Sequence, residues 1–235
     1  MIRERIRDLR HQIADLASRS GKDPSTIRLV LVTKTVPVEA IRSAYEEGVR
    51  DFGENRIQEF LRKKAVLFPD IRWHMVGHLQ TNKVKDYLAA LKESSQPVLL
   101  HSLDRLALAE ALESKAVQMG GMRVPCLIQV NTSAETTKGG FSAEEARVFV
   151  KRLGEFPHLK VEGFMTIGPW TEDREAIRRS FGGLRELRDK SRELCPDFSG
   201  GTLSMGMSGD YEIAIEEGSN MLRIGTLVFG PRSSK

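Results

Sequence analysis

Residues 27–34 read Ile27-Arg28-Leu29-Val30-Leu31-Val32-Thr33-Lys34, an almost wholly apolar and β-branched run that decides the fold. A run of this kind predicts a strand buried on both faces, as in the parallel sheets of α/β proteins. Because side chains alternate along a strand, Val30, Val32 and Lys34 are expected on one face. Lysine is seldom buried without a reason, so its position at the end of this run is informative.

Lys34 stands at the carboxyl end of the predicted strand, where folds built on parallel strands keep their chemistry. An amine withdrawn from water at such a place becomes a nucleophile. The structural alternative is a lysine whose aliphatic stem covers apolar surface while its ammonium group stays in water. Taken alone, this segment leaves both interpretations open.

The composition of the 235-residue chain is that of an ordinary soluble globular protein, 40% hydrophobic and 29% charged. Its formal charge of +4 comes from Lys and Arg scattered among Asp and Glu, with no uninterrupted basic run. This distribution argues against nucleic-acid and membrane binding, and the basic pI is at most a weak sign of an anionic ligand.

The cysteines and the N-terminal segment indicate a cytoplasmic protein. Cys126 and Cys195 stand far apart, which fits a reducing compartment and neither a disulfide framework nor a zinc site. Residues 1–18 carry apolar side chains at helical spacing with acidic residues between them, so they predict an amphipathic surface helix rather than a secretory signal. No stretch approaches the roughly 20 apolar residues of a membrane span.

Short apolar runs alternate with amphipathic stretches along the whole chain. Alternation of this kind implies a parallel sheet, and eight strand-then-helix units in about 235 residues match a closed (β/α)8 barrel. We therefore expect an α/β protein, a single TIM-type barrel domain over residues 1–235 with an extra N-terminal helix. An open doubly wound sheet is the alternative, but the turn after the first strand lacks its Gly-rich pattern. The predicted strands are 27–34, 49–52, 71–76, 98–101, 124–130, 161–165, 202–205 and 221–224.

Polar side chains follow the predicted strands, and in a barrel they gather at the one rim where active sites are built. Some of them are expected to cap helices instead, among them Ser102, Asp104 and Ser142. The rim candidates are Lys34, Glu54, Asn55, His78, Asn82, His101, Asp104, Asn131, Ser133, Thr166, Ser204, Ser208, Arg223 and Thr226.

The last two units suggest a phosphate site. The loop 204–210 joins a strand to a helix with two glycines, and Gly225 and Thr226 follow the eighth strand similarly. Barrels often hold a phosphate with the loops after strands 7 and 8. Arg223 shares strand parity with Gly225, so it points inside if the glycine faces the site. It then needs an acceptor, either in a structural ion pair or in a ligand.

His74 and His78 invite a metal interpretation, which fails on geometry. Their spacing places both on one face only in a helix, whereas residues 71–78 are predicted as a strand running into a loop. Trp73 is expected to pack between the barrel and a helix.

The lysine after strand 1, the phosphate loops and the inward arginine together resemble the pyridoxal-phosphate site of the alanine-racemase-type barrel, PLP fold type III. The closer resemblance is to the pyridoxal phosphate homeostasis protein family, and it covers nearly the whole chain in order. The segments that carry it are Thr33–Thr35, Phe52–Glu59, Trp73–Lys83, His101–Arg105, Gln129–Asn131, Leu203–Ser208 and Arg223–Thr226.

This resemblance implies a role for each of the matching residues. Lys34 holds pyridoxal 5′-phosphate as a Schiff base, Arg223 faces the pyridine nitrogen, and Asn55 lies near the cofactor. The phosphate is held by Ser208, Gly225 and Thr226. Lys138 is a candidate for a second basic contact near the rim.

Arg223 favours a carrier over an enzyme, because a guanidinium can only donate to an unprotonated ring nitrogen and leaves the cofactor a weak electron sink. Racemases of this barrel type add a tyrosine from a C-terminal domain, which we do not expect after Lys235. Of the chain's own tyrosines, Tyr45 and Tyr87 are expected to pack on helices, and Tyr211 at most lines the site.

We expect a cytoplasmic, non-catalytic protein of pyridoxal phosphate homeostasis, a monomer or weak dimer, with apo PLP-dependent enzymes as possible recipients of the cofactor. One alternative is an amino-acid racemase whose second base is His78, Tyr211 or Lys138. Another is a Schiff-base aldolase acting on a phosphorylated sugar through Lys34 without a cofactor.

Overall fold

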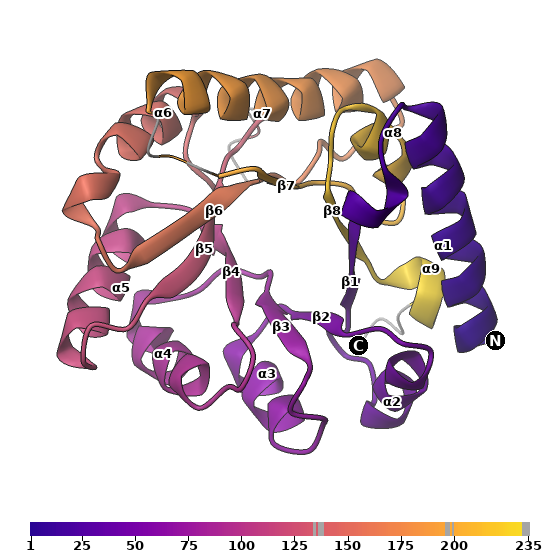
Figure 1. Ribbon diagram of the computed structural model, residues 1–235, viewed down its shortest axis with the longest axis horizontal. Coiled ribbons are helices and arrows are strands. Elements are labelled where there is room, and N and C mark those ends of the chain that lie inside the picture. Colours follow the sequence, from indigo (N-terminus) through magenta and orange to yellow (C-terminus); the bar gives the residue numbers. More distant parts are fainter. Residues whose placement is uncertain (134, 136–138, 196–197, 199, 232–235) are drawn as a thin grey trace.

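The computed structural model describes residues 1–133, 135, 139–195, 198 and 200–231. Eight parallel strands close into a barrel in which each strand pairs with the next and β8 pairs with β1 (Figure 1). The predicted (β/α)8 architecture is therefore confirmed. The strands are β1 Arg28–Val32, β2 Asp51–Glu54, β3 Arg72–Met75, β4 Leu99–Leu103, β5 Val124–Gln129, β6 Leu159–Met165, β7 Thr202–Ser204 and β8 Met221–Ile224.

Helices surround the barrel and connect consecutive strands (Figure 1). Three 3-10 turns lie between them, η1 Pro24–Thr26, η2 Thr81–Lys83 and η3 Leu153–Glu155. None of the helices in the described part of the chain combines the length and apolar character that a bilayer crossing requires. The α-helices are α1 Ile2–Arg19, α2 Val38–Glu46, α3 Ile57–Lys64, α4 Val84–Lys92, α5 Leu106–Gln118, α6 Ala143–Lys151, α7 Arg174–Leu194, α8 Tyr211–Glu216 and α9 Thr226–Phe229.

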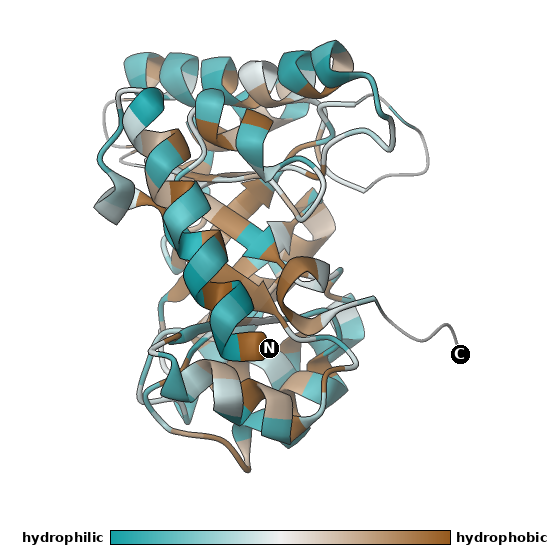
Figure 2. Ribbon diagram, turned by 90° about the vertical axis from the view of Figure 1, so that its right-hand side faces the viewer, coloured by the Kyte–Doolittle hydropathy of each residue, from teal (hydrophilic) through white to brown (hydrophobic). Residues whose placement is uncertain are grey.

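The extra N-terminal helix is present as predicted, and it covers the seam where the barrel closes. α1 packs against α2, α8 and α9 through a buried stripe of Ile6, Leu9, Ile13 and Ala17. Its polar face is turned outward, as the teal bands along the diagonal helix in Figure 2 show. An amphipathic helix of this kind is held mainly by its buried apolar face.

Two apolar cores lie on opposite sides of the strands. The larger fills the layer between barrel and helices, where Trp73 lies 5.6 Å from Phe60 of α3 and 6.3 Å from Phe52, as ring centroids. The predicted packing of Trp73 is thus confirmed. The smaller core, inside the barrel, consists of Val30, Leu99, Leu127, Met165 and Met221.

β1 is shorter than predicted. The Thr33 amide still donates to the Gly53 carbonyl at 2.8 Å, but the chain then turns, with the Val36 amide donating to Thr33 and Thr35 at φ 63°. Lys34 therefore lies in a turn two residues beyond the strand, and the prediction that it ends the strand is wrong. Because Lys34 lies outside the strand, the alternation of side chains along β1 no longer sets the direction of its side chain.

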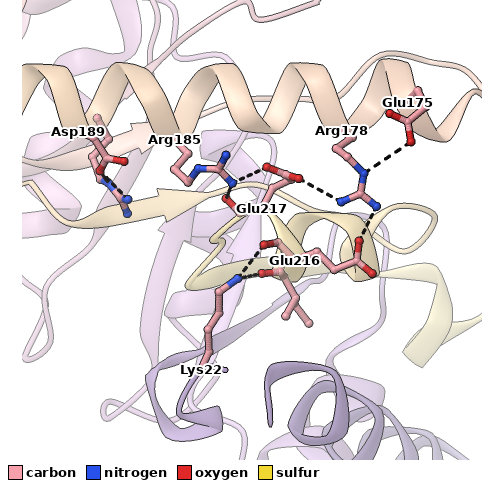
Figure 3. Close-up of polar contacts among 9 residues, drawn as sticks. Lys22, Glu175, Arg178, Arg185, Asp189, Glu216 and Glu217 are labelled. Atoms are coloured by element: carbon pink, nitrogen blue, oxygen red, sulfur yellow. Dashed lines mark hydrogen bonds and ion pairs between the residues drawn. The ribbon is translucent and has the colours of Figure 1, made fainter. Parts of the chain in front are cut away.

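An ion-pair network on the outer face ties α7 to the end of α8 (Figure 3). Arg178 contacts Glu216 at 2.6 Å and Glu217 at 3.0 Å, and Arg185 also pairs with Glu217. Lys22, in the segment after α1, donates to the Glu216 carbonyl at 3.1 Å. Since single surface pairs contribute little, the shared carboxylate of Glu217 is what makes this a network. It fixes the helix that follows the loop 205–210.

Asp51 lies at the amino-terminal end of the barrel and collects donors there. It accepts from Arg72 at 2.5 Å and approaches His74 Nε2 at 3.0 Å. Burial opposes its charge, but the hydrogen bonds from His74 and Arg72 outweigh this and lower the pKa of Asp51 to about 2. The charged carboxylate is therefore part of the folded state.

Replacing Asp51 by Asn should make the unfolding free energy depend less on pH in the acid range. A carboxyl with a lowered folded-state pKa contributes stability above its unfolded pKa, near 4, and loses it as the pH falls towards about 2. Between pH 5 and 2, the wild type should lose about 2 kcal/mol more unfolding free energy than Asp51→Asn. Urea unfolding across this range measures the difference. The exposed Asp8, as Asp8→Asn, is the control, and equal slopes for all three proteins would contradict the assignment.

Candidate functional site

The pairing of β8 with β1 brings the predicted site residues to one place. Leu31 pairs with Ile224, so the turn at Lys34 and the loop at Gly225 leave the barrel side by side. One step earlier in the same register, Val30 pairs with Arg223. Lys34 and Gly225, which are 191 positions apart in sequence, thereby share one end of the barrel, the end where such folds hold ligands.

Lys34 and Asn55 line the same pocket of roughly 930 Å³ at this rim. The far end of α9, at Phe229, forms another wall of it. Asn55 is positioned by close backbone packing, since a Cβ at Gly77 would lie 2.2 Å from the Asn55 carbonyl oxygen. Only glycine at position 77 allows Asn55 to occupy its place beside Lys34.

A buried lysine that the sequence analysis did not single out supports the Lys34 turn. Lys63 of α3 donates to the Thr33 carbonyl at 2.6 Å and pairs with Glu54 and Glu59 at 2.7 Å each. Glu59 also accepts from the Thr35 amide at 2.8 Å. The backbone on both sides of Lys34 is therefore fixed by this cluster.

Glu54 is the buried anion of the cluster. Its side chain is fully buried, and Oε1 accepts from Lys63 and from the Thr33 hydroxyl. No hydrogen-bond partner for Oε2 occurs among the described residues. Burial raises the pKa of Glu54 against the opposing effect of Lys63. The ion pair with Lys63 is what keeps this carboxylate compatible with the layer between β2 and α3.

The loop after β7 meets the start of α9 at Ser208. The Gly225 and Leu227 amides point at Ser208 Oγ from 3.4 and 3.5 Å, which is long for hydrogen bonds. The loop itself is held by Asp210, which accepts from the Met207 amide at 2.5 Å. Two backbone donors and a hydroxyl thus converge on one point, a typical arrangement for an anion.

Arg223 faces the interior of the barrel, as strand parity predicted. Only 5% of its side chain is exposed, and it donates to Ser204 Oγ and to the Thr166 carbonyl at 2.8 Å each. Both acceptors are uncharged. Burial lowers the pKa of Arg223 to about 10, against a raising effect of Asp210, so the guanidinium remains protonated at neutral pH.

His78 and Asp104 form a second polar group at the rim. The carboxylate of Asp104 lies 2.6 Å from His78 Nδ1 and also pairs with Arg105. Asp104 is therefore no helix cap, and neither is Ser102, whose hydroxyl donates to the Gly77 carbonyl at 2.7 Å. Both expected caps are wrong, because α5 begins at Leu106, after the N-cap residue Arg105, without a side-chain cap.

Ser142, by contrast, caps α6 in a capping box with Glu145, as predicted. His101 departs from expectation in a different way. It was expected at the carboxyl end of the fourth strand, at the rim, but β4 extends to Leu103 and His101 is fully buried within it.

The three tyrosine hydroxyls are engaged away from the rim. Tyr45 donates to Asp70, and Tyr87 donates to the Val98 carbonyl. Tyr211 donates to Gln12 of α1 at 3.0 Å, so its hydroxyl points outward rather than into the site. The expectation that Tyr211 at most lines the site is consistent with this orientation.

The remaining observations concern Lys138, metal binding and Trp170. Lys138 lies outside the described residues. No group of three His, Cys, Asp or Glu side chains that could hold a metal ion occurs in the described ranges. Trp170, in the loop after β6, is 94% exposed.

The barrel and its rim define a known class. The family described as "Alanine racemase, N-terminal domain" matches residues 5–233, and the chain belongs to it. Alanine racemase from Corynebacterium glutamicum has a TM-score of 0.69 at 15% identity, covering 96% of this chain and 61% of the racemase. That likeness concerns the fold alone.

Within this class the chain belongs to the pyridoxal phosphate homeostasis proteins, which confirms the resemblance seen in the motifs. The protein of that name from Aquifex aeolicus (strain VF5) is 42% identical over 232 residues, 97% of either chain. PipY of Synechococcus elongatus PCC7942, solved with PLP bound, has a TM-score of 0.83 at 32% identity. That match covers 98% of this chain and 100% of PipY.

Replacing Lys63 by Met should destabilise the protein by about 3–5 kcal/mol, because it leaves Glu54 buried without its cation. Adding Glu54→Leu should restore part of the loss, since the uncompensated charge is then gone. Denaturant unfolding at neutral pH measures both variants. Lys85→Met, at an exposed lysine of α4, is the control. If Lys63→Met cost no more than this control, the cluster would not support the Lys34 turn.

Proposed function

We propose that this protein binds pyridoxal 5′-phosphate and stores or delivers it in cytoplasmic pyridoxal phosphate homeostasis, without robust catalysis. The observation that carries the proposal is the pairing of β1 with β8, which brings the Lys34 turn next to the segment where the Gly225 amide meets the Ser208 hydroxyl. The PLP-bound structure of the related PipY supports the same cofactor. In this proposal residues 1–235 act as one domain, and apo PLP-dependent enzymes are the recipients.

The rim residues fit the phosphate of this cofactor. The amides of Gly225 and Leu227 make only long contacts with Ser208 Oγ, so a phosphate oxygen offers them a better acceptor than the hydroxyl does. Thr226, the first residue of α9, stands between Gly225 and Leu227 in sequence and carries a hydroxyl. We assign phosphate binding to Ser208, Gly225 and Thr226.

Lys34, Asn55 and Arg223 complete the proposed site. When bound, pyridoxal phosphate supplies an electrophilic aldehyde and an electron-withdrawing ring. Lys34 would supply the amine that holds the aldehyde, and Asn55 lines the wall of the same pocket. Arg223, held inside the barrel by Ser204 and Thr166, would donate an N–H to the ring nitrogen and keep its own proton.

Two properties of these residues favour a carrier over an enzyme. Arg223 stays protonated at neutral pH, so the ring nitrogen that it faces is left without a proton of its own. The hydroxyls of Tyr45, Tyr87 and Tyr211 donate to partners elsewhere in the protein. Tyrosine is therefore a poor choice for the second base that a racemase needs.

His78 is the observation that favours the alternative, an amino-acid racemase. Asp104 lies against His78 Nδ1 and orients the ring, which leaves Nε2 as a base. The pocket that His78 lines also contains Asn55, the residue that borders the Lys34 pocket. The His78–Asp104 pair thus lies near the rim, and a proton-exchange experiment on His78 tests whether it acts as a base.

Lys34→Ala should abolish covalent retention of pyridoxal phosphate, because the amine that holds the aldehyde is absent. The wild type, loaded and dialysed, should keep a visible absorbance band that borohydride reduction fixes to the peptide containing Lys34. Lys34→Arg, which keeps the charge, should also lose the band, whereas the exposed Lys85→Ala should keep it. A band that survives in Lys34→Ala would refute the assignment. A wild type that takes up no cofactor would favour the aldolase.

Exchange of the α-proton distinguishes the carrier from the racemase. For a carrier, the loaded protein should exchange the α-proton of amino acids in D₂O no faster than free pyridoxal phosphate, yet reactivate an apo PLP enzyme. Fast exchange that falls by roughly 10²–10⁴-fold in His78→Gln would identify a racemase with His78 as its base. Proton NMR over a panel of amino acids measures the rates.

A further inference from the structure

Five buried polar side chains form one unbroken chain of hydrogen bonds through the barrel interior. At one end, Asp51 lies 3.0 Å from His74 Nε2, and His74 Nδ1 lies 2.9 Å from His101 Nε2. His101 Nδ1 then lies 3.0 Å from Ser204 Oγ, which accepts from Arg223 at 2.8 Å. The chain crosses from the amino-terminal end of β2 to the arginine on β8.

The chain is largely withdrawn from water. His101 and Ser204 are fully buried, and His74, Asp51 and Arg223 are at most 5% exposed. The interior apolar core surrounds it, because strand alternation turns these polar side chains towards the same space. That core consists of Val30, Leu99, Leu127, Met165 and Met221. Each polar group in such surroundings must find its partner within the protein.

Donor and acceptor chemistry allows one proton order that satisfies every member. Arg223 can only donate, so Ser204 Oγ accepts from it and directs its own hydrogen to His101 Nδ1. His101 then carries its proton on Nε2 and donates to His74 Nδ1. His74 in turn carries its proton on Nε2 and donates to Asp51, which accepts. Both imidazoles are neutral in this order, and the two charges stand at its ends.

The electrostatic surroundings agree with this order. Burial lowers the pKa of His74 despite the opposing effect of Asp51, and it lowers the pKa of His101 well below the usual value. The charged groups facing these rings are Asp51, Arg28 and Arg72 at one end and Arg223 at the other. A proton added to His101 would leave the Ser204 hydrogen without an acceptor in the chain.

We propose that His101, together with His74 and Ser204, is a positioning residue that orients Arg223 towards the bound ring. This role rests on the proposed function, since it presumes a ligand that Arg223 meets. The guanidinium is a planar fork, and fixing one Nη on Ser204 and the other on Thr166 sets its plane. Breaking the chain at His101 leaves the Ser204 hydrogen without its acceptor and frees the hydroxyl to rotate, which loosens one of the two contacts that hold Arg223.

The proton order can be tested without a cofactor. In ¹⁵N-histidine NMR of the full chain, His74 and His101 should both remain neutral with the proton on Nε2 between pH 8 and 5. Assignments follow from His74→Gln and His101→Gln, with the exposed His11 as a reference for a solvated imidazole. A proton on Nδ1 of His101, or protonation of either ring in this range, would overturn the proposed order.

Positioning is tested by a conservative pair of variants at His101. Gln can accept from Ser204 and donate to His74, whereas Leu can do neither, so His101→Gln should preserve what His101→Leu destroys. In the cofactor-free protein, the Arg223 side-chain N–H signals should stay sharp in wild type and His101→Gln and broaden in His101→Leu. Equal signals in all three proteins would refute the positioning role.

The loaded protein provides the second readout. His101→Leu should weaken pyridoxal phosphate retention by about 10-fold and change the visible circular dichroism of the bound cofactor, with His101→Gln close to wild type. If His101→Leu fails to fold, Ser204→Ala removes the acceptor of Arg223 itself with a smaller change and should show at least the same loss. A wild type without affinity for the cofactor would refute the proposed function, and the Arg223 signals then decide the positioning role alone.

Discussion

The pairing of β1 with β8 is the constraint on which the remaining features depend. Closing the barrel abolishes the exposed strand edges, and it also brings the first and last strand-end loops together. Lys34 and Gly225 are neighbours only through this register, because no local contact along the chain connects them. α1 lies over the outside of the same seam and packs against α8 and α9. Closure, site and N-terminal helix therefore form one unit.

Charge placed inside the fold is the second organising feature. Lys63 with Glu54 occupies the layer between strands and helices, and Arg223 occupies the barrel itself. Burying charges is costly, and such groups seldom add net stability over apolar residues of the same size. What they provide here is position. Lys63 holds the backbone beside Lys34, and Arg223 is held by Ser204 and Thr166 in a defined plane.

The architecture was predictable because each apolar run and each amphipathic stretch carries its own periodicity. The inward direction of Arg223 was also predictable, because it shares strand parity with Gly225. The continuation of β4 past His101 to Leu103 did not follow from the local sequence, and the pairing of β4 with β5 shifts register between Leu100 and Leu103. Strand ends of this kind are set by neighbouring strands rather than by the local sequence.

Lys63 was missed for a similar reason, although a signal was present. Its spacing from Ile57 and Phe60 places it on the buried face of α3, where a lysine needs an anion. The partners, Thr33 and Glu54, become neighbours only once β1, β2 and α3 are packed. Lys138, a predicted second contact, lies outside the described residues.

The contrast between the two tryptophans gives the protein two separate optical signals. Trp73 is enclosed by Phe52 and Phe60, so its emission should be blue-shifted and shielded from dissolved quenchers. Trp170 is 94% exposed in a loop that begins beside Thr166, the residue whose carbonyl holds Arg223. Iodide or acrylamide should therefore quench Trp170 and spare Trp73. The remaining emission of Trp73 then reports on packing beside the barrel, and the quenched emission of Trp170 reports on the solvent at the rim.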